Sequence, residues 1–329
     1  MKKIISIILC AVLLAAVFAG CAAKQETEQK NDGKLKVVCT IFPAYDWALN
    51  VLGDKAEAAD VTLLLDTGAD LHSFQPTADD IVKISTCDVF IYVGGESDSW
   101  VDDALKNATN QDMKTVNLLE TLGNSAKEEE VVEGMQGEEE EDAEGEGEEE
   151  PEYDEHVWLS LKNAGVFVDA ISTAFGEADA TNKDAYTANA AAYKAQLDKL
   201  DKEYESAVAS AKTKVLLFGD RFPFRYLTDD YGIKYYAAFV GCSAESEASF
   251  ETITFLAGKA DELNLKNIMV IESSDKKIAN TIIQNTKSKD QKVLVLDSMQ
   301  STTAKDVEGG ATYLKAMQSN LAVLKEALA

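Results

Sequence analysis

Short apolar runs alternate, in the first third of the chain, with segments of helical character. Leu35–Ile41, Ala59–Leu65 and Val89–Val93 predict buried strands, because each run is short and mostly apolar. Between them, Ala44–Leu52 and Ala78–Ser85 predict helices. A glycine follows the first of these helices and a capping threonine precedes the second. This regular alternation predicts a lobe built on a parallel sheet.

The same alternation returns in the last third of the chain. Val215–Phe218, Asn267–Ile271 and Val293–Leu296 predict strands. The helices predicted beside them are Phe255–Leu263, Ile278–Thr286 and Tyr313–Leu328. The chain has 329 residues, which is enough for two such lobes. We therefore predict an α/β fold with an N-terminal lobe over residues 35–175 and a C-terminal lobe over residues 213–329.

A long helical segment joins the two predicted lobes. Residues 182–212 contain no proline or glycine, and apolar side chains recur there at steps of three and four. This spacing places one apolar face along the helix, formed by Tyr186, Ala190, Tyr193, Leu197, Leu200 and Tyr204. At 1.5 Å per residue such a helix is about 45 Å long. We therefore predict a linking helix within residues 176–212.

Residues 127–155 are dominated by Glu with interspersed Gly. Such a composition cannot bury apolar surface, so this insert is predicted to be disordered. The formal net charge of the chain is −27. Nucleic acid is therefore not expected as a partner, because phosphate binding needs clustered Lys and Arg, whereas a negative surface suits cations. The insert has two interpretations, a loop that weakly concentrates cations or a solvated spacer.

The N-terminus has the pattern of a secretion signal. Lys2 and Lys3 precede an apolar core over Ile4–Phe18, which is too short to span a membrane. Small residues then lead to Cys21, and this ending resembles the bacterial lipoprotein signal. The resemblance implies a signal peptide over residues 1–20, a lipid on Cys21 and a tether over residues 21–34 on the outer face of the cell membrane. An ordinary cleaved signal or an uncleaved anchor are the alternatives.

The chain holds only two histidines, His72 and His156. A neutral imidazole is the commonest protein ligand for a transition metal, so the two are candidates for one shared site. The alternative is that each is an ordinary loop histidine. Cys39 and Cys87 lie in apolar runs and are interpreted as core residues. Cys242 lies in a Gly-Cys-Ser loop, and no Cys or Cys/His spacing in the chain predicts a thiolate zinc site.

Three segments resemble, in family order, motifs of the solute-binding proteins of zinc and manganese ABC transporters. They are Phe42–Asp46, Gly68–Thr77 around His72, and Asp154–Ala164 around His156. The similarity covers the chain from about Lys36 to its end. It implies two α/β lobes joined by a rigid helix, with little hinge motion and a metal site in the cleft between the lobes. It also implies that His72 and His156 bind the metal.

The resemblance has two departures. Glu155 stands where the family usually has proline. Arg221 stands where relatives carry a third ligand, His or Glu, and a guanidinium has no lone pair for a cation. Three outcomes stay open for that ligand: Asp220, Glu245, or water with Arg221 paired to a nearby carboxylate. The alternative for Asp220 and Arg221 is a structural ion pair.

Asp297 follows the last predicted strand, where the family has an aspartate ligand, so the resemblance implies that it is the fourth ligand. A helix or turn cap is the alternative for Asp297, and Glu272 is interpreted as a supporting or structural acid. Nitrogen and oxygen donors suit zinc first and manganese second. The resemblance implies a monomer that delivers its ion to a membrane ABC permease and catalyses no reaction. The alternatives are a surface adhesin with a structural metal site and a metallohydrolase.

Overall fold

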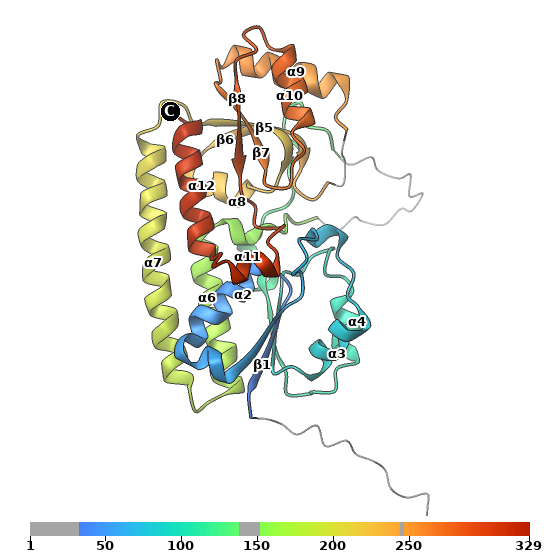
Figure 1. The fold of residues 1–329 in the computed structure, drawn as a ribbon, viewed down its shortest axis with the longest axis vertical. Coiled ribbons are helices and arrows are strands. Elements are labelled where there is room, and N and C mark those ends of the chain that lie inside the picture. Colours follow the sequence, from blue (N-terminus) through green and yellow to red (C-terminus); the bar gives the residue numbers. More distant parts are fainter. Residues whose placement is uncertain (1–32, 138–151, 244–246) are drawn as a thin grey trace, which may run out of the picture. The chain divides into compact units, whose positions relative to one another are not determined.

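The computed structural model describes residues 33–137, 152–243 and 247–329, and Figure 1 shows its fold. The predicted signal peptide, Cys21, the tether up to residue 32, residues 138–151 of the acidic insert and Glu245 lie outside the described residues. Residues 35–329 form one unit, separate from the residues before them. Within the described ranges, no helix is long and apolar enough to cross a membrane.

The N-terminal part contains a four-stranded parallel sheet of order β2-β1-β3-β4. Its strands are β1 (Leu35–Cys39), β2 (Ala59–Leu63), β3 (Val89–Tyr92) and β4 (Lys114–Asn117). The first three confirm the predicted strands, whereas the sequence analysis did not predict β4. The helices and turns of this part are α2 (Phe42–Leu52), η1 (Gly53–Ala58), η2 (Leu71–Ser73), α3 (Ala78–Thr86), α4 (Val101–Lys106), α5 (Leu118–Leu122), η3 (Gly123–Ser125), η4 (Val157–Leu159) and α6 (Leu161–Ala178).

The C-terminal part repeats this design with a parallel sheet of order β6-β5-β7-β8. Its strands are β5 (Val215–Phe222), β6 (Lys234–Val240), β7 (Asn267–Ile271) and β8 (Lys292–Leu296). Its helices are α8 (Arg225–Tyr231), α9 (Phe250–Glu262), α10 (Lys277–Asn285), α11 (Ala304–Glu308) and α12 (Tyr313–Ala327). β5 runs four residues beyond its predicted end at Phe218, and its register shifts between Phe218 and Arg221. That irregular end carries Asp220 and Arg221.

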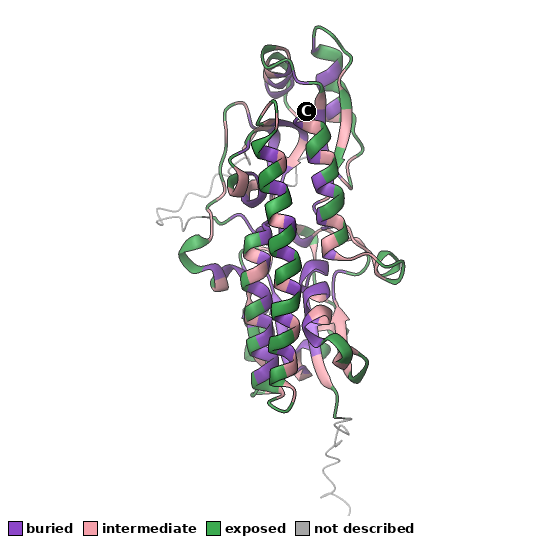
Figure 2. Cartoon of the chain, turned by 90° about the vertical axis from the view of Figure 1, so that its left-hand side faces the viewer, coloured by how far each residue is buried: buried purple, intermediate pink, exposed green. Residues whose placement is uncertain are grey.

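A single helix, α7 (Lys183–Ala209), occupies the segment predicted as the linking helix. Its predicted apolar face is buried along its whole length, and Figure 2 shows buried and exposed residues on opposite sides of the long helices. The Tyr193 hydroxyl donates to Asp46 Oδ2 in α2 at 3.2 Å. The Tyr204 hydroxyl donates to the Met317 carbonyl in α12 at 2.6 Å. The helix α7 therefore contacts elements of both halves of the chain. The predicted lobe boundaries at residues 175 and 213 stay predictions.

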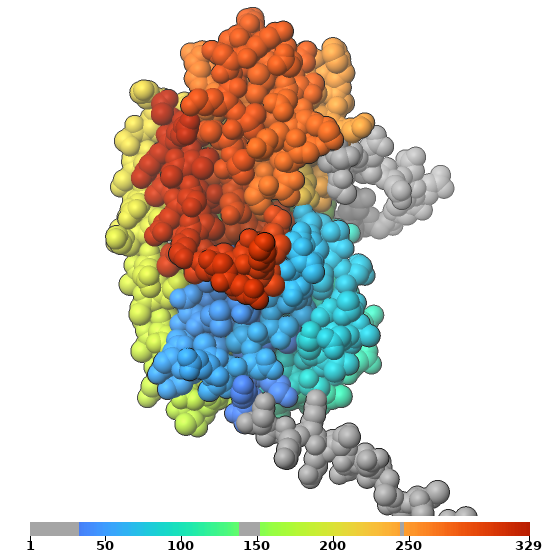
Figure 3. Space-filling view, in the orientation of Figure 1, coloured from blue at the N-terminus to red at the C-terminus, as the bar shows by residue number. Residues whose placement is uncertain are grey.

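A large hydrophobic core includes residues of both sheets, and a second cluster lies between the C-terminal sheet and the helices α9 and α10. At the centre of the large core the ring of Trp47 lies 5.5 Å from that of Phe167 and 5.1 Å from that of Tyr313, which joins α2, α6 and α12. At the surface, the Ala304 amide donates to the Asp66 carbonyl at 2.7 Å. Figure 3 shows the red segment around α11 packed against the blue N-terminal part. A shared core of this kind favours local loop movement over hinging.

Candidate metal centre

The two histidines are positioned by the same local device. His72 lies in η2, and Asp70 Oδ1 accepts a hydrogen bond from the His72 amide at 3.1 Å. His156 lies directly before η4, and Asp154 Oδ1 accepts from the His156 amide at 2.9 Å. An aspartate two residues before each histidine thus fixes a tight turn through a side-chain-to-backbone bond. The turn of His72 follows β2, whereas the turn of His156 follows the acidic insert.

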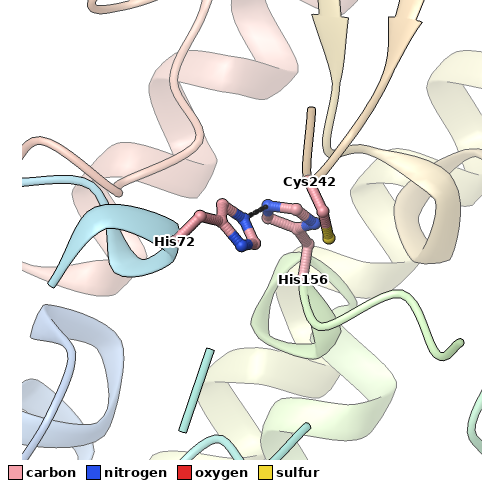
Figure 4. A group of neighbouring side chains, drawn as sticks. All are labelled: His72, His156 and Cys242. Carbon is pink, nitrogen blue, oxygen red and sulfur yellow. Dashed lines mark hydrogen bonds between the residues drawn. The ribbon is translucent and has the colours of Figure 1, made fainter. Parts of the chain in front are cut away.

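The imidazoles of His72 and His156 face one another. Their Nε2 atoms are 3.2 Å apart, and their ring centroids are 5.1 Å apart. Figure 4 shows the two rings pointing toward each other from separate segments of the chain. His156 is completely buried, whereas 13 % of the His72 side chain is exposed. The pair is therefore accessible from the His72 side alone.

The other ring nitrogens have acceptors of their own. His156 Nδ1 lies 3.0 Å from Asp154 Oδ1. His72 Nδ1 lies 2.8 Å from Ser97 Oγ and 3.4 Å from Glu155 Oε2. These neighbours assign the ring proton to Nδ1 in both neutral histidines. Both Nε2 lone pairs then point at the same space, where they repel one another unless a proton or a cation lies between them.

The spacing of the two Nε2 atoms fits a tetrahedral zinc ion. With zinc–nitrogen bonds of 2.0–2.1 Å, two ligands at the tetrahedral angle are about 3.3 Å apart. The observed separation is 3.2 Å. Burial, together with the charge of a protonated His156, lowers the pKa of His72 to about 3. The lowered pKa favours the neutral form of His72, which is the form that binds a metal. Burial opposes the charged form of His156, but Asp154, Glu155 and Asp70 together outweigh it and raise the pKa of this histidine.

Glu155, the residue in the proline position, is buried beside the pair. Its Oε1 accepts from the Ser97 amide at 2.9 Å, and its Oε2 has no hydrogen-bond partner among the described residues. Burial raises the pKa of this carboxyl group. Gly95, with φ +81°, makes room for it, because a Cβ there would lie 2.3 Å from Oε1. A cation bound at the histidine pair would offset the negative charge of the ionised Glu155 carboxylate.

A cysteine that the sequence analysis set aside belongs to the same cluster. Ligand atoms of His72, His156 and Cys242 all lie within 4.8 Å of one another. Cys242 follows β6 and has a free thiol, and Figure 4 shows it beside the His156 ring. Burial and the neighbouring Glu129 raise the pKa of this thiol. Cys39 and Cys87 are buried, as predicted for core residues.

The Arg221 guanidinium pairs with the N-terminal half of the chain. Its Nη2 lies 2.5 Å from Asp70 Oδ2, and its Nη1 donates to the Ser243 carbonyl at 3.4 Å. The carboxylate pairing left open for Arg221 is therefore present, with Asp70 as the partner rather than the neighbouring Asp220. Because Asp70 also fixes the turn that carries His72, this ion pair connects β5 to that turn.

Comparison with known proteins identifies the family. Residues 37–327 match the family model described as zinc-uptake complex component A, periplasmic. The chain belongs to this zinc-uptake family. Its resemblance to metal-transporter solute-binding proteins is thereby confirmed.

Relatives of the chain carry names that refer to zinc. The chain is 32 % identical over 316 residues to the high-affinity zinc uptake system protein ZnuA of Bacillus subtilis, and the match covers 96 % of the chain and 94 % of that protein. It is 32 % identical over 327 residues to the zinc-binding lipoprotein AdcA of Streptococcus pneumoniae. That match covers 99 % of the chain but 61 % of the streptococcal protein, so the chain spans about three-fifths of this relative.

Solved structures of the zinc-uptake family share the fold. The metal-dependent lipoprotein YcdH of Bacillus subtilis matches with a TM-score of 0.71 at 29 % identity, over 90 % of this chain and 100 % of that one. The Zn(II)-bound ZnuA-like domain of Streptococcus pneumoniae AdcA matches with a TM-score of 0.69 at 28 % identity, over 90 % and 99 %. The predicted fold, two α/β lobes with a long helix, is therefore confirmed.

The carboxylates suggested by the zinc-uptake resemblance are not members of the three-residue cluster. Asp220 lines the same cavity of about 460 Å³ as His72, and its oxygens accept from the Arg221 and Ile271 amides at 2.9 and 3.4 Å. Asp297 follows β8, and its Oδ1 accepts from the Met299 amide at 2.8 Å. Within the described ranges, neither joins the three-residue group. Their roles as ligands stay predictions.

Glu272 has a structural position in this member of the zinc-uptake family. Its carboxylate accepts from the amides of Ser298, Gln300 and Ser301 at 2.7, 3.1 and 3.3 Å. It also accepts from the hydroxyls of Ser298 and Ser301. These bonds hold the loop that follows Asp297, in agreement with the supporting role expected for Glu272.

Proposed function

We propose that this chain captures a zinc ion outside the cytoplasm and delivers it to a membrane ABC permease. The observation that carries the proposal is the facing pair of Nε2 atoms, 3.2 Å apart, in His72 and His156. This separation matches the edge of a tetrahedral zinc site. The family description and the zinc-binding names of the relatives support the same cargo.

His72 and His156 bind the ion through Nε2. Asp297, implied by the family resemblance, and Asp220, which shares the cavity with His72, are the candidate carboxylate ligands. Asp220 lies near the carboxyl end of β5, and Asp297 comes directly after β8. Ligands of open α/β sheets gather beyond the carboxyl ends of the parallel strands. The ion then joins both halves of the chain and stabilises the folded state by its binding free energy.

Zinc is favoured over manganese by the donors and by their supports. Two neutral imidazoles suit zinc, whereas manganese prefers carboxylate, carbonyl and water oxygens. Asp154 stands behind His156 and Glu155 behind His72, an arrangement that fixes a ligating ring and raises its basicity. Manganese is the second candidate cargo. The proposal contains no catalytic step. Asp154 and Glu155 are assigned the role of orienting the two imidazoles, and neither is assigned the role of a general base.

The location of the protein follows from its N-terminal pattern and its family. We propose that Cys21 carries the lipid, that the chain is anchored to the outer face of the cell membrane and that it acts as a monomer. The family description as periplasmic supports an extracytoplasmic site of action. Replacing Cys21 with serine tests the anchor, and persistence of the variant in the membrane fraction would contradict it.

Competitive metal loading tests the proposed cargo. Purified protein is stripped with a chelator, offered equal zinc and manganese, desalted and measured by elemental analysis. We expect one zinc per chain and little manganese, and we expect His156→Ala to lose the zinc. Retention of manganese instead of zinc, or of no metal, would contradict the proposal.

A further inference from the structure

We propose that the thiolate of Cys242 is a third protein ligand of the metal, in place of the donor that Arg221 cannot supply. This inference rests on the proposed zinc site and specifies its chemistry. The cysteine was overlooked in the sequence because no other cysteine or histidine lies at ligand spacing from it. The fold brings it to the histidines, so that ligand atoms of all three residues lie within 4.8 Å of one another.

Zinc binding by all three residues requires the cluster to close around the ion. A zinc–sulfur bond is about 2.3 Å and a zinc–nitrogen bond 2.0–2.1 Å, so sulfur and nitrogen ligands are about 3.6 Å apart at the tetrahedral angle. The upper limit in the cluster is 4.8 Å. Figure 4 shows the sulfur beside the His156 ring nitrogen that does not face His72, so the Cys242 side chain and its loop must move before the sulfur can bond an ion held by both Nε2 atoms.

The chain positions Cys242 through contacts on each side of it. Gly241 packs on His156, where an added Cβ would lie 3.0 Å from both Nδ1 and Cε1 of the ring, so the close approach depends on glycine. The Cys242 amide donates to Glu129 Oε1 at 3.2 Å. Arg221 holds the next residue by donating to the Ser243 carbonyl at 3.4 Å. The arginine that cannot bind metal thus steadies the loop that carries the thiol.

A second observation at the same place points to a cation. Only 3 % of Glu155 is exposed, and its Oε2 has no hydrogen-bond partner among the described residues while it lies 3.4 Å from His72 Nδ1. A buried carboxylate with one oxygen outside any hydrogen bond is costly unless a nearby positive charge offsets it. A zinc ion at His72, His156 and Cys242 provides that charge through the His72 ring.

A thiolate ligand sets the metal preference of the site. Two imidazoles and one thiolate form a soft donor set that suits zinc and disfavours manganese, which prefers oxygen. On binding, the S–H bond breaks, the sulfur–zinc bond forms and the proton leaves to solvent. The fourth position is then available to water or to one carboxylate, in the tetrahedral geometry of a zinc site.

Cobalt(II) substitution reads the sulfur bond directly. Stripped protein is titrated with cobalt(II), and the near-ultraviolet band of sulfur-to-cobalt charge transfer is recorded beside the visible bands that report cobalt binding. We expect the charge-transfer band in the native chain and its loss in Cys242→Ser. Cys87→Ser, which removes a buried thiol elsewhere, is the matched control and should keep the band. Zinc affinity should fall at least tenfold in Cys242→Ser and stay unchanged in Cys87→Ser.

The outcomes separate this inference from the function on which it rests. Cobalt and zinc binding without the charge-transfer band would overturn the role of Cys242 and leave a site built on His72 and His156. Failure of the native chain to bind either metal would overturn both proposals. Thermal unfolding of the metal-free Cys242→Ser chain should match that of the native chain, and a folded variant that keeps full zinc affinity would also overturn the inference.

Discussion

His72 and His156 meet through their Nε2 atoms at 3.2 Å, and the other nitrogen of each ring faces an oxygen acceptor. The free Nε2 lone pairs of the two imidazoles therefore point into the same space between the rings. A ligand pair prepared in this way loses little conformational freedom when the ion arrives. The predictions below test how neighbouring residues maintain or complete the pair.

Glu155→Gln tests the acid behind His72. The variant keeps the size of the side chain and removes its negative charge, so His72 loses a carboxylate neighbour on Nδ1. Loss of such a supporting group typically costs 10–100-fold in metal affinity. We expect a loss in this range in competition with a chromogenic chelator. Glu177→Gln, on an exposed residue of α6, is the control and should bind zinc like the native chain. Equal affinities in all three proteins would remove Glu155 from the site.

Arg221→His tests whether the family position and Cys242 substitute for one another. The resemblance places a ligand at this position, so a histidine there should compensate for loss of the thiol. We expect the double variant Arg221→His, Cys242→Ser to recover at least half of the zinc binding free energy lost by Cys242→Ser. Arg221→Lys in the same background keeps the positive charge beside Asp70 and should recover nothing. Recovery by lysine as well would indicate that removal of the guanidinium restores binding, instead of ligation by the histidine.

Asp297→Ala and Asp220→Ala separate the two candidate carboxylates. Removal of a ligand should weaken zinc binding at least about tenfold, which is roughly 1.4 kcal/mol. We expect this loss for Asp297→Ala, because the resemblance implies a ligand there, and a smaller loss for Asp220→Ala. The difference is measured by the same chelator competition. Unchanged zinc affinity in Asp297→Ala would show that Asp297 is not a ligand and that its role is the structural hydrogen bond with the Met299 amide.

Asp46 predicts a pH dependence of stability away from the metal site. Burial raises the pKa of Asp46 from 3.8 to about 6 in the folded chain, despite hydrogen bonds from Tyr193 and the Tyr313 amide. The folded state therefore disfavours the charged form. The resulting penalty is absent below about pH 4, grows between about pH 4 and 6, and is complete above about pH 6. A rise of this size corresponds to roughly 3 kcal/mol.

Urea unfolding at pH 4.5 to 7.5 measures this penalty. Because an asparagine side chain carries no charge, we expect Asp46→Asn to gain stability relative to the native chain as the pH rises, by about 1–3 kcal/mol over the interval. Asp54→Asn, on an exposed residue of η1, should follow the native chain at every pH. A constant difference between Asp46→Asn and the native chain would contradict a raised pKa.

The strands predicted from the sequence are short apolar runs. β3 and β7 are almost wholly buried, and their residues are correspondingly apolar. β4 is four residues long and begins with Lys114, so it forms no apolar run. β6 was not predicted, although the six residues after Lys234 form an apolar run. Their place in the sheets depends on pairing with β3 and β5, which a local pattern does not contain.

The site shows the same division between local and tertiary information. His72 and His156 were found because they are the only histidines of the chain and because each lies in a motif of the family. Cys242 was missed because its partners are distant in the sequence and meet it only through the end of β6. The partner of Arg221 was likewise not identified, since Asp70 lies on a loop of the other half of the chain.

Nuclear magnetic resonance of histidine ring nitrogens tests the central claim most directly. The chain has two histidines, so selective ¹⁵N labelling gives two Nε2 and two Nδ1 signals. We predict that both Nε2 signals shift together and reach their end point at one equivalent of zinc, while both Nδ1 atoms keep their protons. A shift of one ring alone, or of neither, would show that His72 and His156 do not share one zinc ion.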